Sequence, residues 1–143
     1  MNAINSVLFT RAGWGITVLR IFIGIIFMAH GSQKLFGLFG GGGLAGTAQY
    51  MESLGLTPPT LMAMLSGGAE FFGGLALVIG LLVRPAALAL VGLLLVAIFS
   101  VHIGNGLFMA NNGYEFALAL LGGSLAVLIE GAGKLSVDRA IAG

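Results

Sequence analysis

Ionisable side chains occur deep inside the long apolar segments of this chain. Arg20 lies within the apolar stretch 14–36 and Glu70 within the stretch 60–83, while His102 and Glu115 lie in two further apolar stretches. An ionisable group at membrane depth is costly, so it usually faces a helix-bundle interior or a cavity and has a partner. Histidines and carboxylates in such positions are typical of proton relays and of ligand sites. We therefore expect the function to lie where these side chains meet.

The apolar stretches are numerous and long enough to predict an all-α membrane protein. The chain has 143 residues, of which 58% are hydrophobic and 8% charged. A soluble domain has roughly 25% charged residues, and a spanning helix needs about 20 mostly apolar residues. Four such helices are predicted over residues 14–36, 60–83, 85–109 and 114–131. With short second and third connections, they predict a single domain, 1–143, built as an antiparallel bundle of four transmembrane helices.

Composition also excludes several function classes. Cysteine is absent, which removes disulfides, Fe–S ligation and a dithiol relay within this chain. Any electrons must therefore pass through a bound cofactor or a partner. The net charge of +1 comes without a basic cluster, so no nucleic acid partner is expected.

The positive charges are distributed unevenly between the predicted connections. Arg11, Arg84, Lys134 and Arg139 fall on the side that holds both termini, whereas the other side has only Lys34 near a helix end. Because cytoplasmic loops carry an excess of Lys and Arg, both termini are predicted to be cytoplasmic. We expect a multi-pass protein of the inner (plasma) membrane, in contact with the lipid bilayer.

The first connection, residues 37–59, differs from the others because it is long and begins with a run of glycines. Its residues 44–54 carry apolar side chains at helical spacing. This pattern predicts a short helix that lies on the membrane surface or re-enters the bundle mouth.

Four ionisable residues are predicted to lie at nearly the same depth. At about 1.5 Å per residue, His30, Glu70, His102 and Glu115 lie about 21–25 Å from the cytoplasmic edge. Lys34 lies one turn above His30 on the same helix face. The sequence therefore predicts a polar cluster in the outer part of the bundle.

Structural roles for these residues are open alternatives. Arg20 is lower, at about 9 Å, and could form an ion pair with Glu70 that fixes helix register. His102 could be a neutral histidine bonded to a backbone carbonyl, and Glu115 could complement the positive end of the fourth helix. The charged residues near the C-terminus are interpreted as an ordinary cytoplasmic tail: Glu130, Lys134, Asp138 and Arg139.

Several segments together resemble the DoxX family of small four-helix inner-membrane proteins. They are LRIFIGIIFMAHGSQKLFG, the loop ending in LGLTPP, GGAEFFGGLALVIGLLVRPAAL and HIGNGLFMANNGYEFAL, in this order. The resemblance covers about Val18 to Glu130. Matching polar and glycine positions include Arg20, His30, Gly31, Lys34, Glu70, Gly73, Arg84, His102, Asn112, Gly113 and Glu115.

The resemblance implies a membrane component of a redox system, linked in some relatives to quinones or catechols and to oxidative stress. Together with the polar cluster, it predicts a bound quinone as cofactor. Glu70, His102 and Glu115 are the predicted catalytic, proton-carrying residues. Arg20, His30, Lys34 and Asn112 are the predicted cofactor-binding residues. The isoprenoid tail is expected along Phe27, Phe71 or Phe99.

Other function classes remain open from the sequence. Two histidines and two carboxylates at one level could ligate a metal ion or haem iron, although no metal-ligating residue is assigned. The chain could also be a non-catalytic membrane anchor for a soluble oxidoreductase, or a small-solute permease. A soluble redox partner and a homo-oligomer are both compatible with it. The sequence does not decide whether the chain is an enzyme or a subunit of a quinone-linked oxidoreductase.

Overall fold

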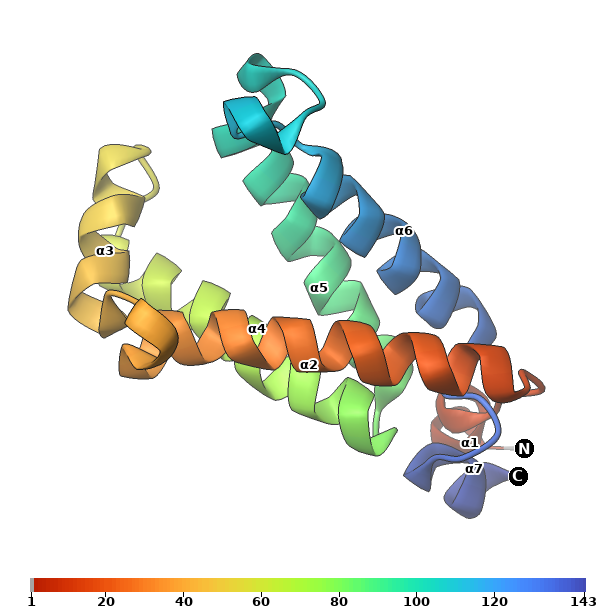
Figure 1. Ribbon diagram of the computed structural model, residues 1–143. Coiled ribbons are helices and arrows are strands. Elements are labelled where there is room, and N and C mark those ends of the chain that lie inside the picture. Colours follow the sequence, from red (N-terminus) through yellow and green to blue (C-terminus); the bar gives the residue numbers. More distant parts are fainter. Residues whose placement is uncertain (1) are drawn as a thin grey trace.

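The computed structural model describes residues 2–143, and every regular element within them is helical. Figure 1 shows two long helix pairs that start together near the chain termini and diverge away from them. Helix α2 (Trp14–Phe36) is paired with α4 (Pro59–Ile79). Helix α5 (Val83–Ala97) is paired with α6 (Glu115–Glu130).

The first two long helices follow the sequence prediction closely. The bounds of α2 are those predicted, and the helix stops where Gly37 adopts φ 70°, a left-handed conformation that glycine accepts at no steric cost. Helix α4 begins at Pro59, whose missing N–H is not needed in a first turn. It ends at Ile79 rather than at the predicted residue 83, because Gly80 has φ 77°. The helical backbone therefore breaks one turn earlier than the apolar pattern suggests.

The third apolar stretch is not a uniform α-helix. Helix α5 passes into a π-helical turn, η2 (Ile98–His102), and then into a 3₁₀ turn, η3 (Ile103–Asn105). A further 3₁₀ turn, η4 (Met109–Asn111), precedes α6. We call residues 98–115, which close the far end of the α5–α6 pair, the cap. The prediction of a helix from 85 to 109 was wrong at its C-terminal end, because the winding changes at Ile98.

Three helical segments are long and apolar enough to cross a membrane. They are Trp14–Phe36, Pro59–Ile79 and Val83–Asn105, the last including η2 and η3. Helix α6 has 16 residues, which is short against the roughly 20 that a spanning helix needs. The all-helical prediction is confirmed with three candidate spans, and the antiparallel bundle of four spans stays a prediction.

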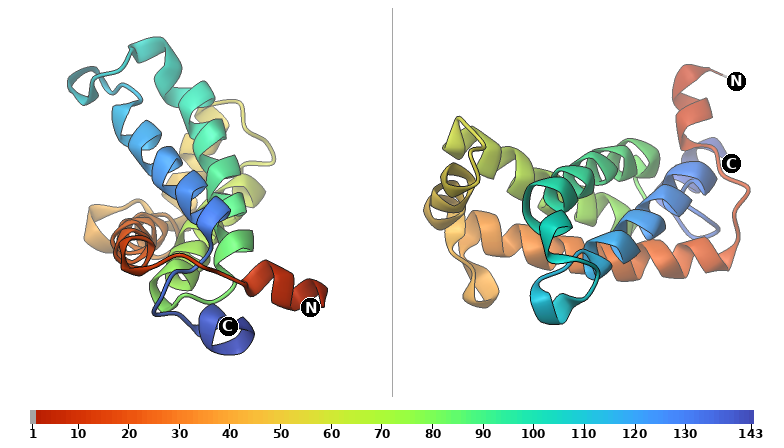
Figure 2. Two further views of the ribbon diagram at one scale, coloured as in Figure 1. Left: turned by 90° about the vertical axis from the view of Figure 1, so that its right-hand side faces the viewer. Right: turned by 90° about the horizontal axis from the view of Figure 1, so that it is seen from above.

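The two helix pairs end in different structures (Figures 1 and 2). The α2–α4 pair carries η1 (Leu38–Gly40) and α3 (Gly43–Ser53), and α3 packs on both α2 and α4. The α5–α6 pair carries the cap. Helix α3 confirms the predicted short helix in the first connection. Its Thr47 and Met51 are buried, which makes α3 a cover over the α2–α4 interface.

Close backbone approach holds α2 against α4. A Cβ atom added at Gly31 would lie 2.3 Å from the Phe71 backbone N, and one added at Gly74 would lie 2.6 Å from the Met28 N. Small residues allow such an approach between transmembrane helices. The buried apolar core joins all four long helices and includes Ile23, Phe27, Leu77, Leu90, Leu94 and Leu120.

Both chain termini lie at the end of the molecule where the helix pairs meet. Helix α1 (Ala3–Leu8) contacts α7 (Val137–Ala142), and Figure 2 shows them together, with α3 at the opposite end. We call this the terminal end. The arrangement separates three places where polar groups gather: the terminal end, the α2–α4 interface beneath α3, and the cap.

Candidate functional site

Lys34 and Glu70 form an ion pair across the α2–α4 interface. The Lys34 Nζ donates to Glu70 Oε1 at 2.8 Å and to Ser66 Oγ at 2.7 Å. Ser66 precedes Glu70 by four residues on the same face of α4, so both reach the same ammonium group. Lys34 lies in the last turn of α2, where the helix dipole favours a cation. Among residues 2–143 this is the only salt bridge.

The pair is buried unequally between its two members. The Glu70 side chain is 10% exposed, and the Lys34 side chain is 28% exposed. The Glu70 Oε2 atom is buried and has no hydrogen-bond partner among the described residues. An ammonium group has three donors, of which Lys34 uses two. The pair therefore offers one carboxylate acceptor and one ammonium donor to a bound molecule.

Helix α3 covers the α2–α4 interface near the pair, and three aromatic rings lie close to the pair in sequence. Thr47 Oγ1 of α3 donates to the Lys34 carbonyl at 3.2 Å. The Phe71 ring, next to Glu70 in sequence, meets Phe36 edge-on at 5.4 Å and Phe72 at 5.2 Å between centroids. Helix α3 thus covers the interface that holds the pair, and Phe36 and Phe72 are exposed on the helices that carry it.

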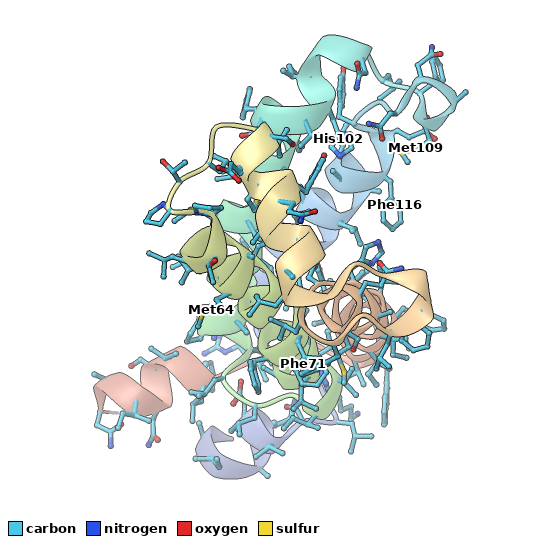
Figure 3. The ribbon with its side chains drawn as sticks, turned by 90° about the vertical axis from the view of Figure 1, so that its left-hand side faces the viewer. Met64, Phe71, His102, Met109 and Phe116 are labelled. Carbon is cyan, nitrogen blue, oxygen red and sulfur yellow. The ribbon has the colours of Figure 1, made fainter. Side chains whose placement is uncertain are left out.

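The three phenylalanines predicted to contact the isoprenoid tail of the quinone differ in their exposure. Phe27 is 2% exposed and belongs to the core, so no ligand tail can lie along it without opening the core. Phe99 is exposed at the base of the cap, and Phe71 follows Glu70 on α4 and packs edge-on against Phe36. Figure 3 shows Phe71 low on the α2–α4 side, away from the cap.

Arg20 lies at the terminal end and does not contact Glu70. It is 1% exposed, and its Nε donates to the Ala132 carbonyl at 2.6 Å. Its Nη1 donates to the carbonyls of Leu77 at 2.6 Å and Val78 at 3.0 Å, and its Nη2 donates to Leu135. The alternative of an Arg20–Glu70 ion pair was wrong, because the guanidinium is taken up by backbone carbonyls.

A second arginine closes the terminal end in the same way. Arg84 Nε donates to the Leu128 carbonyl at 3.1 Å and Nη2 to the Ile129 carbonyl at 3.0 Å. Its Nη1 donates to the carbonyls of Val7 and Phe9. Arg84 therefore ties the N-terminal segment to the end of α6. From the sequence, Arg84 was identified as a positive charge on the side of the termini and as one of the positions that match the DoxX family.

Asp138 is the residue that the sequence interpretation placed most wrongly. It is buried, and its carboxylate accepts hydrogen bonds from the backbone N–H groups of Leu82 at 2.8 Å and Val83 at 3.0 Å. These are N-terminal groups of α5, which need an acceptor. The interpretation as part of a solvated tail was wrong, although Asp138 is the single aspartate of the chain, a rarity that could have drawn attention to it.

His102 and Glu115 serve the internal hydrogen bonding of the cap. His102 Nδ1 donates to the Asn112 carbonyl at 2.9 Å, and Asn105 Nδ2 donates to the same oxygen at 3.1 Å. Glu115 Oε2 accepts from the Met109 N–H at 3.0 Å. Asn112, with φ 56°, turns the chain toward α6. Figure 3 shows His102 and Met109 together at the cap.

His30 lies between the two helix pairs. Its Nδ1 donates to the Ile26 carbonyl at 2.9 Å, and its ring lies 6.0 Å from the Phe116 ring, next to Glu115. Because a carbonyl can only accept, Nδ1 carries the proton in both histidines, and Nε2 makes no hydrogen bond to the described residues. Each ring can therefore still accept or donate through Nε2.

The predicted cluster at one depth is thus divided. The structure joins Lys34 to Glu70, and it joins His102 to Asn112 with Glu115 in the same cap. His30 lies between these two groups, and Arg20 lies far from both. Within residues 2–143, no three His, Asp or Glu side chains lie close enough together to hold a metal ion. The four residues predicted at one depth therefore do not come together as a four-ligand metal centre.

Comparison with known proteins points to one family. A family model described as DoxX matches residues 15–103. The inner membrane protein YqjF of Escherichia coli is 37% identical over 131 residues, which cover 87% of this chain and 90% of that protein. The putative oxidoreductase CatD of Bacillus subtilis is 32% identical, with coverage of 87% and 84%. The Escherichia coli inner membrane protein YphA is 30% identical, with coverage of 85% and 86%. No solved structure gives a significant match.

Proposed function

Since the chain belongs to the DoxX family of inner-membrane proteins, we propose that it binds a quinone-like lipophilic molecule at the Lys34–Glu70 pair, as part of a membrane redox system. The observation that carries this proposal is the buried carboxylate oxygen of Glu70 that lacks a partner. A buried polar group without a hydrogen bond is costly. A ligand with a polar head would remove that cost.

The surroundings favour a ligand with an aromatic head and an apolar tail. The pair lies on two apolar helices, and Phe36, Phe71 and Phe72, which are near it in sequence, form a set of edge-on rings. Small-molecule sites are mostly apolar, with a few polar groups that fix orientation. A quinone or quinol ring fits this description, because a ring oxygen can accept from Lys34, a ring hydroxyl can also donate to Glu70, and the apolar substituents meet the apolar side chains.

The redox association rests on the relatives rather than on the geometry. One relative at 32% identity carries the name putative oxidoreductase. Because this chain has no cysteine, electrons would reach the ligand from a soluble or membrane partner. The proposal does not require this chain to catalyse electron transfer by itself.

His30 of α2 and two residues of the cap have a secondary role in the proposal. His30, His102 and Glu115 lie toward the end opposite the termini, and both histidines have an available Nε2. We place them on a route by which protons pass between the pair and the outer face, with Asn112 holding His102 in one tautomer. Arg20 has no part in ligand binding in this proposal.

The proposed topology has four spans with both termini in the cytoplasm. Lys134 and Arg139 lie at the terminal end with Arg11 and Arg84, and this excess of positive charge favours the cytoplasmic side. The Lys34–Glu70 pair would then lie toward the outer leaflet. A short α6 can complete the span if the bilayer thins locally or flanking side chains extend to the interface.

The test is a ligand inventory of protein purified in mild detergent, with organic extraction, mass spectrometry and metal analysis. Wild type is compared with Glu70→Gln and with Glu52→Gln, a matched change at an exposed residue of α3. The proposal predicts a near-stoichiometric quinone or quinol in wild type and Glu52→Gln that is lost during purification of Glu70→Gln. Quinone retained in Glu70→Gln, or a stoichiometric metal without quinone, would overturn it. Intact protein with neither ligand would indicate a scaffold acting through partners.

A further inference from the structure

The hydrogen-bonding groups of the Lys34–Glu70 pair also bear on the oxidation state of the ligand. We propose that the pair recognises a hydroxyl group on the ring, so that the reduced hydroxylated form, a quinol or another phenol, binds more tightly than the oxidised quinone. This inference rests on the proposed function for the class of ligand. It is carried by the donors and acceptors that the pair leaves available.

The pair leaves one acceptor and one donor side by side. Glu70 Oε1 is taken by Lys34, and Glu70 Oε2 has no partner among the described residues. An ionised carboxylate can only accept hydrogen bonds, whereas an ammonium can only donate them. The partner that satisfies both groups must therefore donate to Oε2 and accept from Nζ.

A hydroxyl group does both, and a quinone carbonyl does not. A hydroxyl has one donor and two acceptor lone pairs, so a single ring O–H can donate to Oε2 while accepting from Lys34. A carbonyl accepts from Lys34 but leaves Oε2 unsatisfied in a buried site. Sites built to hydrogen-bond a hydroxyl reject analogues that lack it, because the buried polar group is then unpaired.

The ligand reaches the pair from the lysine side. Lys34 is 28% exposed at its side chain and Glu70 is 10% exposed, so the ammonium marks the open side. The Lys34 side chain is a flexible four-carbon chain. A change in its conformation would expose Glu70 Oε2 while the hydrogen bond from Lys34 Nζ to Glu70 Oε1 is kept. Ser66, which holds the ammonium at 2.7 Å, is then a positioning residue for Lys34.

The experiment measures the dissociation constants of three probes on wild-type protein in nanodiscs under anaerobic conditions. The probes are a short-chain alkylated 1,4-benzoquinone, its hydroquinone, and the dimethyl ether of that hydroquinone. The ether keeps the ring and can accept but not donate. We expect the hydroquinone to bind roughly 10- to 100-fold more tightly than the quinone or the ether. Equal binding of hydroquinone and ether would overturn the inference without any mutation.

Variants then assign the preference to the pair. In Glu70→Gln, titrated to high probe concentration, the hydroquinone should bind only as weakly as the quinone, because the amide can donate as well as accept, so the ratio of the two dissociation constants should fall to near one. Glu52→Gln, the matched change at an exposed residue of α3, should retain the preference. An unchanged ratio in a folded Glu70→Gln would overturn the assignment to Glu70. Failure of all three probes to bind wild type would overturn the proposed function itself, whereas binding without preference would overturn only the present inference.

Discussion

Arg20 and Lys34 are both charged and lie on the same helix, but their hydrogen-bond partners and their burial differ. The Arg20 guanidinium is buried and donates to four backbone carbonyls from α4 and from the segment after α6. The Lys34 ammonium is part-exposed and is held by two side chains, one of which keeps an unpartnered oxygen. At the terminal end every nitrogen of the Arg20 guanidinium is hydrogen-bonded, whereas at the α2–α4 interface beneath α3 one oxygen of Glu70 has no partner among the described residues.

The difference separates a structural charge from a candidate ligand site. A buried polar group that is fully hydrogen-bonded rigidifies the fold, whereas one that is partly satisfied is costly. Such a cost persists when the group has a use in binding. From the sequence, Arg20 was the ion-pair partner considered for Glu70 although it lies lower along its helix, and the hydrogen bonds instead assign Lys34 to Glu70.

The largest expected effect is at the terminal end. Arg20→Leu removes the donors to four buried carbonyls, so we expect the free energy of unfolding to fall by about 3 kcal/mol or more. Thermal or SDS-induced unfolding in detergent measures this. Arg11→Leu is the control, because Arg11 is exposed and lies over the Phe9 ring. Equal stability of the two variants would contradict the structural role assigned to Arg20.

The next effect tests the close approach that brings Lys34 to Glu70. In Gly31→Ala the new Cβ would lie 2.3 Å from the Phe71 backbone N, so α2 and α4 must separate, at a cost of about 2 kcal/mol. Gly68→Ala, on α4 with nothing within 4 Å of the added atom, should cost nothing measurable. Ligand binding should weaken in Gly31→Ala alone. Equal behaviour of the two alanine variants would contradict this packing.

A smaller effect is expected from opening the pair itself. Lys34→Met leaves the Glu70 carboxylate buried without its cation, and because Lys34 is part-exposed we expect a loss of about 1–2 kcal/mol. Adding Glu70→Leu to Lys34→Met should recover part of this stability, since the unpaired charge is then gone. Additive losses in this double-mutant cycle would show that the two side chains do not interact.

The smallest effect is expected in the cap. His102→Ala removes one of two donors to the Asn112 carbonyl, so the loss should be about 0.5–1 kcal/mol. Faster amide hydrogen exchange should appear within residues 98–115 and not at the terminal end. Global destabilisation as large as that of Arg20→Leu would mean that the cap, too, holds the fold together.

Much of the fold was predictable because apolar length and glycine position determine it locally. The bounds of α2 and the helix in the first connection follow from the residue pattern. The pattern also placed Lys34 and Glu70 among the polar residues of the outer bundle, but it did not predict that they pair with each other. The pattern gives the height of a side chain along its helix. It does not give the direction in which helix pairs diverge, so the division between the pair and the cap could not be predicted.

The errors have a shared physical cause, which is bonding to the backbone. Arg20 and Asp138 are buried by pairing with main-chain carbonyls and N–H groups. Such partners carry no sequence signal, because every residue has them. The change of winding at Ile98 likewise occurs inside an uninterrupted apolar run.

The most direct test of the distinction between the three polar regions is to map where a ligand binds. A hydroquinone with a photoreactive diazirine on a short alkyl substituent is crosslinked to the membrane-embedded protein, and the modified residues are identified by mass spectrometry. Adducts on α2, α3 and α4 around Lys34 and Glu70, suppressed by excess unlabelled hydroquinone, are the predicted result. Competed adducts confined to residues 98–115, or to the terminal end near Arg20, would contradict the assignment of the ligand site to this pair.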